Sequence, residues 1–297
     1  MTGSGRSRLL TIVIKIVIAA AVLYLAAAVV LYFLQDKLIF PAPRGGVRDP
    51  ADAGLSAAES LEIVSSDNTK LHGYLLFPHG AARKDLPALL LFHGNGENVT
   101  FDASWLELLR TSGAAVAEVD YRGYGLSEGA PSEKGFFEDG WAALAALRAR
   151  PEMDTNKIVL LGSSIGAAVA VFVASKAEAE GRPVAGVILQ SPFDTLPNVA
   201  MKHYPVFPRF IVKYQFDSLS RIGSLKTPSL FLHGSADTIV PVSHARALHS
   251  AAPAARPFLL IEGAGHNDLI SVAGDRYMHA IREFVHEVTR NSSTVPR

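Results

Sequence analysis

The chain has 297 residues, with 28 basic and 28 acidic side chains and no cysteine. The charges cancel and no basic stripe is interleaved with aromatics, so we expect no nucleic-acid partner. The lack of cysteine excludes a disulfide framework, a thiolate nucleophile and cysteine zinc sites. Since no H-E-x-x-H or similar cluster occurs either, we expect neither a metal nor another cofactor.

The N-terminal 38 residues are predicted to form a membrane anchor. Ile16 to Leu34 is a run of 19 uncharged, mostly apolar residues, which would span about 28 Å as a helix, close to the hydrocarbon thickness. It ends in Tyr32 and Phe33, an aromatic pair typical of the membrane interface. We therefore expect a single-pass anchor.

A cleaved secretory signal peptide is the competing interpretation, because the segment has a basic start and small residues at Ala26 to Ala28. A buried core helix is a poor alternative for an apolar segment at the N-terminus with basic flanks. Arg6, Arg8, Lys15 and the terminal amine slightly outweigh the basic residues that follow the run. The positive-inside rule then predicts a cytoplasmic N-terminus and a catalytic domain outside the cytoplasm.

Residues 39–56 are rich in proline and glycine and are predicted to be a linker. In residues 57–290, continuous apolar runs alternate with helical patterns, which predicts one α/β domain with a mostly parallel sheet and helices on both faces. Residues 291–297 are predicted to be a disordered tail. The expected strands are 71–77, 88–92, 115–119, 158–161, 187–189, 229–232 and 258–261, and the expected helices are 103–110, 136–148, 165–177, 243–250 and 276–288.

A serine in a sharp turn is the candidate nucleophile. Gly162 to Gly166 reads GSSIG and fits G-x-S-x-G. It follows an apolar strand and opens a helix, as this motif requires. The turn would project Ser164 from the sheet edge, with a helix N-terminus behind it that favours negative charge. We interpret Ser163 as a small turn residue.

A serine hydroxyl needs a histidine base and a carboxylate that orients the histidine. Among ten histidines, only His266 follows a late strand in a Gly-rich loop, GAGHND, after the nucleophile and a candidate acid. Asp237, at the end of the strand SLFL, is the preferred acid, and Asp194 in QSPFD is its rival. Asp268 is expected to be a local loop partner.

Acyl transfer also needs donors for the oxygen that becomes negative. We expect them to be the backbone amides of Ile165, after the nucleophile, and of Asn95, in the loop LLLFHGNGEN. His93 is expected to shape this loop. Without its position after an apolar strand, the same loop could equally be a tight turn with no catalytic role.

A long aromatic connection, residues 193–227, is predicted to be a short cap. Connections this long at such a position are usually functional lids. Its aromatics could hold an acyl or aryl group, or could simply pack the cap onto the sheet. A site near a bilayer makes a small-molecule or lipid-like ester the expected substrate, but no substrate-binding residue and no oligomeric state can be assigned.

Five segments carry a family resemblance: LFHGNGEN, VDYRGYGLSEG, IVLLGSSIGAAVA, FLHGSADTIVP and EGAGHND. Together with the anchor, they resemble the single-pass, membrane-anchored serine hydrolases of the bud-emergence (Bem-like) group, within the α/β-hydrolase superfamily. The resemblance implies an α/β-hydrolase fold and a triad of Ser164, Asp237 and His266. It also implies that residues 120–125, DYRGYG, form a structural turn beside the site. Ser163 departs from the group, whose members often carry a bulkier or charged residue there.

These observations favour a serine hydrolase that cleaves carboxylic esters or thioesters through an acyl-enzyme intermediate. A serine peptidase on the same triad is an alternative, because ester and amide attack need the same groups. A catalytically silent, membrane-tethered binding module is a third, although it has no chemical need for all three residues. Dehalogenase and epoxide hydrolase chemistry would need a carboxylate at position 164.

Overall fold

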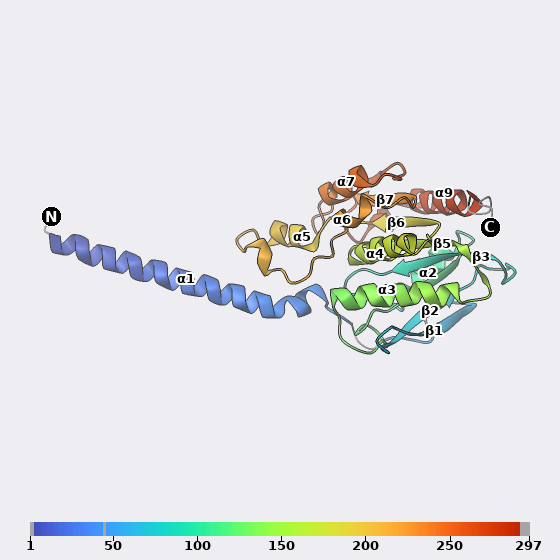
Figure 1. Cartoon of the computed structure of the whole chain (residues 1–297), viewed down its shortest axis with the longest axis horizontal. Coiled ribbons are helices and arrows are strands. Elements are labelled where there is room, and N and C mark those ends of the chain that lie inside the picture. The colour runs from blue at the N-terminus through green and yellow to red at the C-terminus, as the bar shows by residue number, and fades with distance from the viewer. Residues whose placement is uncertain (1–2, 44–45, 292–297) are drawn as a thin grey trace.

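The computed structural model describes residues 3–43 and 46–291. A long helix, α1 (Gly3–Ile39), extends from an α/β body, and the last described helix, α9 (Asp275–Asn291), ends on the opposite side of that body (Figure 1). The predicted tail, apart from Asn291, lies outside the described residues.

In the described residues the body contains one sheet of eight strands in the order β1-β2-β4-β3-β5-β6-β7-β8. β2 pairs antiparallel with β1 and β4, and the strands from β4 to β8 pair in parallel. The strands are β1 (Ala58–Val64), β2 (Lys70–Leu76), β3 (Leu86–Phe92), β4 (Ala115–Val119), β5 (Met153–Ser163), β6 (Gly186–Gln190), β7 (Ser229–Gly234) and β8 (Leu259–Ile261).

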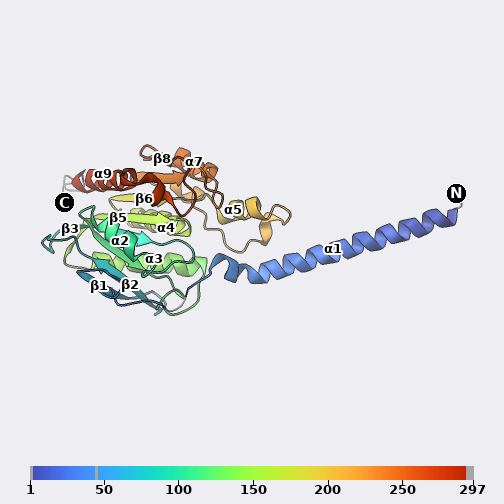
Figure 2. The same ribbon diagram turned by 180° about the vertical axis from the view of Figure 1, so that it is seen from behind.

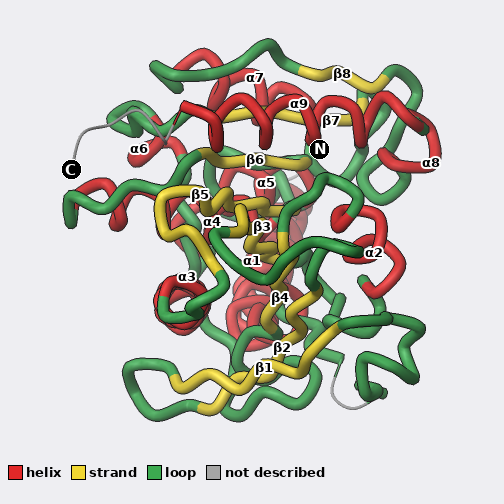
Figure 3. The backbone as a smooth tube through the Cα atoms, turned by 90° about the vertical axis from the view of Figure 1, so that its right-hand side faces the viewer, coloured by secondary structure: helices red, strands yellow, loops and turns green. Residues whose placement is uncertain are grey.

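Helices cover both faces of the sheet, as Figure 3 shows end-on. One buried apolar cluster joins the sheet to α3, α4, α6 and α7, and a second joins it to α2, α8 and α9. The mostly parallel sheet with two covered faces confirms the predicted fold class. These helices are α2 (Ala103–Arg110), α3 (Glu133–Arg148), α4 (Ile165–Ala179), α6 (Leu219–Ile222), α7 (Val242–Ala251), α8 (Leu269–Ala273) and α9 (Asp275–Asn291).

The connection between β6 and β7 contains α5 (Leu196–His203), the 3-10 helix η1 (Arg209–Ile211) and α6. The side chain of Thr195 caps α5 by accepting from the amide of Asn198. α5 and the loop after it lie on the side of the body from which α1 extends (Figures 1 and 2). We call residues 193–227 the cap.

The helix α1 is longer than its apolar run. Its stretch Ser7–Ile39 is the one described helix long and apolar enough to cross a membrane, and none of its apolar window is buried in the protein. Leu23 and Phe33 are about 70% exposed. An exposed apolar helix of this kind is unlike the core helix of a globular domain.

The edge strand β1 has no counterpart among the expected strands. Its sequence, AESLEIV, has only one fully buried residue, Ile63. A half-exposed edge strand carries no continuous apolar run, which is the signal by which the other strands were expected.

Candidate active site

Ser164 lies in the sharp turn between β5 and α4, with φ 53° and ψ −115°. This is a strained conformation for a residue with a side chain. The turn is possible because two glycines allow close packing. A Cβ on Gly162 would lie 2.3 Å from the Gly166 carbonyl, and a Cβ on Gly166 would lie 2.1 Å from the Phe92 carbonyl. The amide of Ser164 donates to the carbonyl of Gln190 (2.9 Å), which ties the turn to β6.

His266 lies between Ser164 and Asp237. Its Nε2 is 3.0 Å from the Ser164 Oγ, and its Nδ1 is 2.7 Å from the Asp237 Oδ2. With the ring proton on Nδ1, the imidazole donates to Asp237 and accepts from the serine hydroxyl. The three residues come from loops after β5, β7 and β8, at the carboxyl edge of the sheet, where parallel sheets place their sites.

Asp237 is held by four groups. Its Oδ1 accepts from the amides of Ile239 (2.9 Å) and Val240 (2.8 Å), and its Oδ2 lies 3.3 Å from the Nε2 of His233 as well as beside His266. Burial raises the pKa of Asp237, but the contacts with His233 and His266 outweigh it and hold the pKa below its ordinary value. The carboxylate therefore stays ionised beside the imidazole.

His233 was not singled out from the sequence. It is fully buried on β7, four residues before Asp237, and also contacts the carbonyl of Val240 (2.8 Å). The available signal was its position at the carboxyl end of the strand that carries the acid.

Asp194 lies elsewhere, in the cap. Its Oδ1 is 2.7 Å from the Nδ1 of His244, and its Oδ2 accepts from the side-chain amide of Asn198 (2.8 Å). The structure thus brings Asp237, and not Asp194, to His266. Asp268 accepts from the amide of Gly265 (2.6 Å), a contact within the histidine loop.

The loop after β3 lies against the nucleophile turn. The Nδ1 of His93 donates to the Gly94 carbonyl (2.8 Å), and burial lowers the pKa of His93 to about 4, so the ring is neutral. The Asn95 side chain accepts from the Tyr124 hydroxyl (3.1 Å). Within the described residues the Asn95 amide has no acceptor, and Ile165, as the first residue of α4, has no i−4 carbonyl in the helix.

Comparison with known proteins agrees with this architecture. Residues 84–220 match the family model described as "Serine aminopeptidase, S33". The chain is 33% identical to the uncharacterised protein Rv2307c of Mycobacterium tuberculosis over 91% of this chain and 94% of that one. It is 31% identical to the uncharacterised membrane protein YNL320W of Saccharomyces cerevisiae, over 86% of this chain and 90% of that one.

Among solved structures, the esterase Pf2001 of Pyrococcus furiosus superposes with a TM-score of 0.66 at 22% identity, over 84% of this chain and 97% of that one. The chain is 36% identical to the α/β-hydrolase domain-containing protein 17C of Xenopus laevis, over 69% of this chain and 63% of that one. The chain belongs to the α/β-hydrolase family. The yeast relative, a membrane protein by its printed name, fits the Bem-like group that the five segments resemble.

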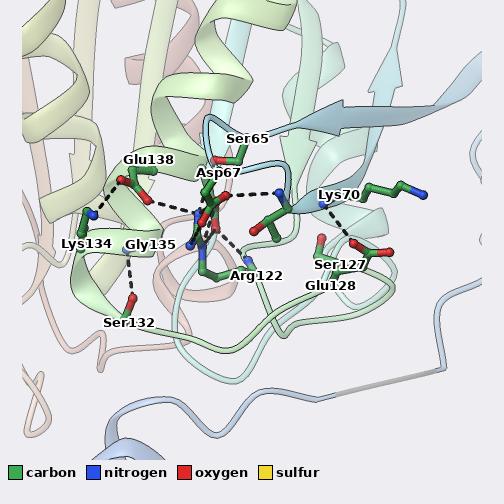
Figure 4. A network of polar contacts seen from close by, with 12 residues as sticks. Ser65, Asp67, Lys70, Arg122, Ser127, Glu128, Ser132, Lys134, Gly135 and Glu138 are labelled. Carbon is green, nitrogen blue, oxygen red and sulfur yellow. Dashed lines mark hydrogen bonds and ion pairs between the residues drawn. The ribbon is translucent and has the colours of Figure 1, made fainter.

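In this hydrolase the segment 120–125 forms a tight turn fixed by Arg122 (Figure 4). The guanidinium binds Asp139 through Nη2 (2.7 Å) and Asp67 through Nη1 (2.8 Å), and the Arg122 amide also donates to Asp139 (2.8 Å). A Cβ on Gly125 would lie 2.0 Å from the Asp120 carboxylate. These contacts join the turn between β1 and β2, the loop after β4 and the helix α3.

A group of buried carboxyls lies behind the loop that carries Asn95. Burial raises the pKa of Asp102 to about 7, with Glu97 adding to the rise, and burial raises the pKa of Asp120 to about 7. Burial also raises the pKa of Glu118, with Asp102 adding. Neutral and ionised forms of Asp102 and Asp120 therefore exchange near neutral pH.

A cavity of about 440 Å³ opens beside Ser164 in the hydrolase. This volume is in the range of small-molecule sites. Its floor includes Ser163, whose Oγ accepts from the side-chain amide of Gln190 (3.2 Å). Of the described residues that line it, Glu97 is the one with a carboxyl group. Burial raises the pKa of Glu97, and the Gly94 amide (2.6 Å) and His266 offset part of this rise.

Proposed function

We propose that this hydrolase cleaves carboxylic ester or thioester bonds through an acyl-enzyme intermediate. The relay from Ser164 through His266 to Asp237 at the edge of an apolar cavity supports this function best. A general base within hydrogen-bond reach of the nucleophile is the first geometric requirement for this chemistry. A catalytically silent binding module has no need for the relay.

In the proposed reaction, the Ser164 Oγ attacks the carbonyl carbon while the Nε2 of His266 takes the hydroxyl proton. The tetrahedral intermediate collapses, the proton passes to the departing alcohol or thiol, and an acyl-serine forms. A water molecule then attacks the acyl-serine and gives a proton to His266, and the second tetrahedral intermediate releases the acid as His266 returns that proton to the Ser164 Oγ. Asp237 holds the Nδ1 proton and stabilises the imidazolium.

The amides of Asn95 and Ile165 are the proposed donors to the oxyanion. The Ile165 amide also lies at the N-terminus of α4, which favours negative charge. Each such donor typically contributes about 3 kcal/mol to transition-state stability.

Labelling with a fluorophosphonate probe tests the nucleophile. Wild type should label and Ser164→Ala should not, whereas the neighbouring Ser163→Ala should still label. An unlabelled wild type, or equal labelling of Ser164→Ala, would overturn the proposal and favour the silent module.

We also propose that α1 anchors the hydrolase in a membrane with the N-terminus cytoplasmic. Because the chain has no cysteine, single cysteines can report the orientation. Lys134→Cys should react with an impermeant maleimide on intact cells, and Ser7→Cys only after permeabilisation. The reverse pattern would place the catalytic domain in the cytoplasm, and loss of the α1 residues from the mature protein would instead indicate a cleaved signal peptide.

A serine peptidase on the same three residues is the second candidate. The family description and the Glu97 carboxyl in the cavity favour it, because a free α-amino group could pair with Glu97. Hydrolysis of aminoacyl amides at a higher kcat/KM than matched esters, lost in Glu97→Gln, would support the peptidase. Retention of ester cleavage with no amide cleavage would exclude it.

A further inference from the structure

We propose that the membrane helix α1 is a wall of the substrate cavity, and that the substrate is a long-chain acyl ester or thioester that enters from the bilayer. This inference rests on the proposed ester hydrolysis and adds the substrate class. The cavity beside Ser164 and His266 is also lined by Leu31, Gln35, Leu38 and Ile39. The last turns of α1 thus face the reacting serine across an apolar space.

The contact between α1 and the cap is specific. The Gln35 side chain donates to the Ile211 carbonyl (2.8 Å) and accepts from the Lys213 amide (2.8 Å). Gln35 is only 9% exposed. The Gln35 side-chain amide is buried, and these two backbone groups satisfy both its donor and its acceptor. They therefore hold α1 at one position against the cap.

Asp36 extends this contact, and accepts from the Tyr214 hydroxyl (2.8 Å) and from the Lys213 ammonium (3.3 Å). Burial, with Asp36 adding, raises the pKa of Tyr214 to about 12, so the hydroxyl stays protonated and keeps donating.

A second contact lies nearer the N-terminus. The Tyr24 hydroxyl donates to the Val206 carbonyl (2.9 Å), and its ring stacks on Phe207 with centroids 5.5 Å apart. Tyr24 precedes Gln35 by eleven residues, which is about 16 Å along a helix. The cap therefore follows α1 for about three turns (Figure 2).

This contact places the cap at the lipid. The hydrocarbon core takes about 20 helical residues, and the helical stretch Ser7–Ile39, which contains the apolar run Ile16 to Leu34, has 33. A membrane-spanning segment of about 20 residues that ends anywhere between Ala28 and Leu34 includes Tyr24. The cap residues beside Tyr24 then reach the lipid surface or lie below it.

The cap surface agrees with that position. Tyr204, Val206 and Phe210 are 48%, 69% and 85% exposed. These three side chains lie within seven consecutive residues of the cap, and exposed apolar and aromatic side chains close together mark a surface that another apolar phase covers. Since α1 passes through the bilayer beside them, lipid is that phase, and an acyl chain can pass from it into the cavity without crossing water.

The test compares chain lengths with the full-length protein in detergent micelles. Each methylene buried contributes about 0.8 kcal/mol, so kcat/KM for p-nitrophenyl esters should rise about fourfold per methylene until the cavity is full. Leu31→Trp, which fills the cavity from α1, should lower the ratio of kcat/KM for the C16 ester to that for the C4 ester at least tenfold. Leu34→Trp, a matched change outside the cavity lining, should leave this ratio within twofold.

Two outcomes would overturn the inference: a wild type that prefers the C4 ester, or equal ratios for Leu31→Trp and Leu34→Trp. If Leu31→Trp does not fold, Leu38→Trp makes the same change about two helical turns later, also in the cavity lining. Failure of the proposed function is distinct, because wild type would then hydrolyse neither ester and would not react with a fluorophosphonate.

Discussion

A Cβ on Gly234 would lie 2.2 Å from the carbonyl oxygen of Ala264. This close approach joins the end of β7, which leads to Asp237, to the loop that carries His266. We expect Gly234→Ala to move the two loops apart. A displacement near 1 Å in a catalytic group can cost about a hundredfold in rate. The measurement is kcat/KM for a short ester, and Gly223→Ala is a suitable comparison, since Gly223 has a φ of −65° and a Cβ there would meet only the Ala251 carbonyl, at 3.9 Å. Similar rates for Gly234→Ala and wild type would contradict this role.

The two candidate acids can be separated by amide substitution. Asp237→Asn should lower kcat by about 10³ to 10⁴, because the imidazole loses the partner that fixes its tautomer. Asp194→Asn should change kcat less than tenfold, since Asp194 pairs with His244 in the cap. The reverse order would assign the acid to Asp194.

The buried carboxyls predict a dependence of stability on pH. The folded state raises the pKa of Asp102 from 3.8 to about 7, so it binds this proton more tightly than the unfolded state. Stability from this group is complete below pH 4 and is lost as pH rises through about 7. The pKa of His93 is lowered in the folded state, so His93 contributes stability above pH 6.5, and this contribution is lost as pH falls below 6.5.

Comparison with a variant isolates the carboxyl. Between pH 5 and pH 8, the free energy of unfolding of Asp102→Asn should rise relative to wild type by at least about 1 kcal/mol. Urea titrations at both pH values measure it. A difference that does not change with pH would show that Asp102 titrates alike in both states.

The Arg122 turn predicts a loss of stability. Arg122→Ala leaves Asp139, whose side chain is 1% exposed, without its cation. Removing one partner of a buried ion pair costs about 3 kcal/mol or more. Lys134→Ala removes an exposed ion pair with Glu138 on the same network and should cost under about 0.5 kcal/mol (Figure 4). Equal melting temperatures for the two variants would contradict the structural role of the turn.

Local patterns predicted much of this molecule. The apolar runs of β3 to β7 are buried on both faces of the sheet, so a continuous apolar sequence is enough to predict these strands. The nucleophile turn is local too, since Gly162, Ser164 and Gly166 lie within five consecutive residues. His266 and Asp237 were expected from chain order, and their proximity in the structure follows from parallel strands that end at one edge.

Other features depend on contacts between distant segments. Gln35 follows an apolar run and reads as part of a membrane exit, yet its partners, Ile211 and Lys213, are more than 170 residues away. The spacing of apolar residues in the sequence cannot indicate a contact between segments so far apart. The half-exposed strand β1 and the buried His233 were likewise determined by what packs on them, and not by their own sequence patterns.

The attachment of α1 to the cap at Tyr24 and at Gln35 has a geometric consequence. In the proposed membrane arrangement, a helix held at two heights cannot swivel about its exit point, so the catalytic body would keep one tilt and Ser164 one distance from the membrane plane. Scissile bonds at that depth reach the serine, and bonds buried deeper or carried farther out do not. The enzyme would then discriminate among lipids by where the ester lies along the molecule, before any head group is recognised.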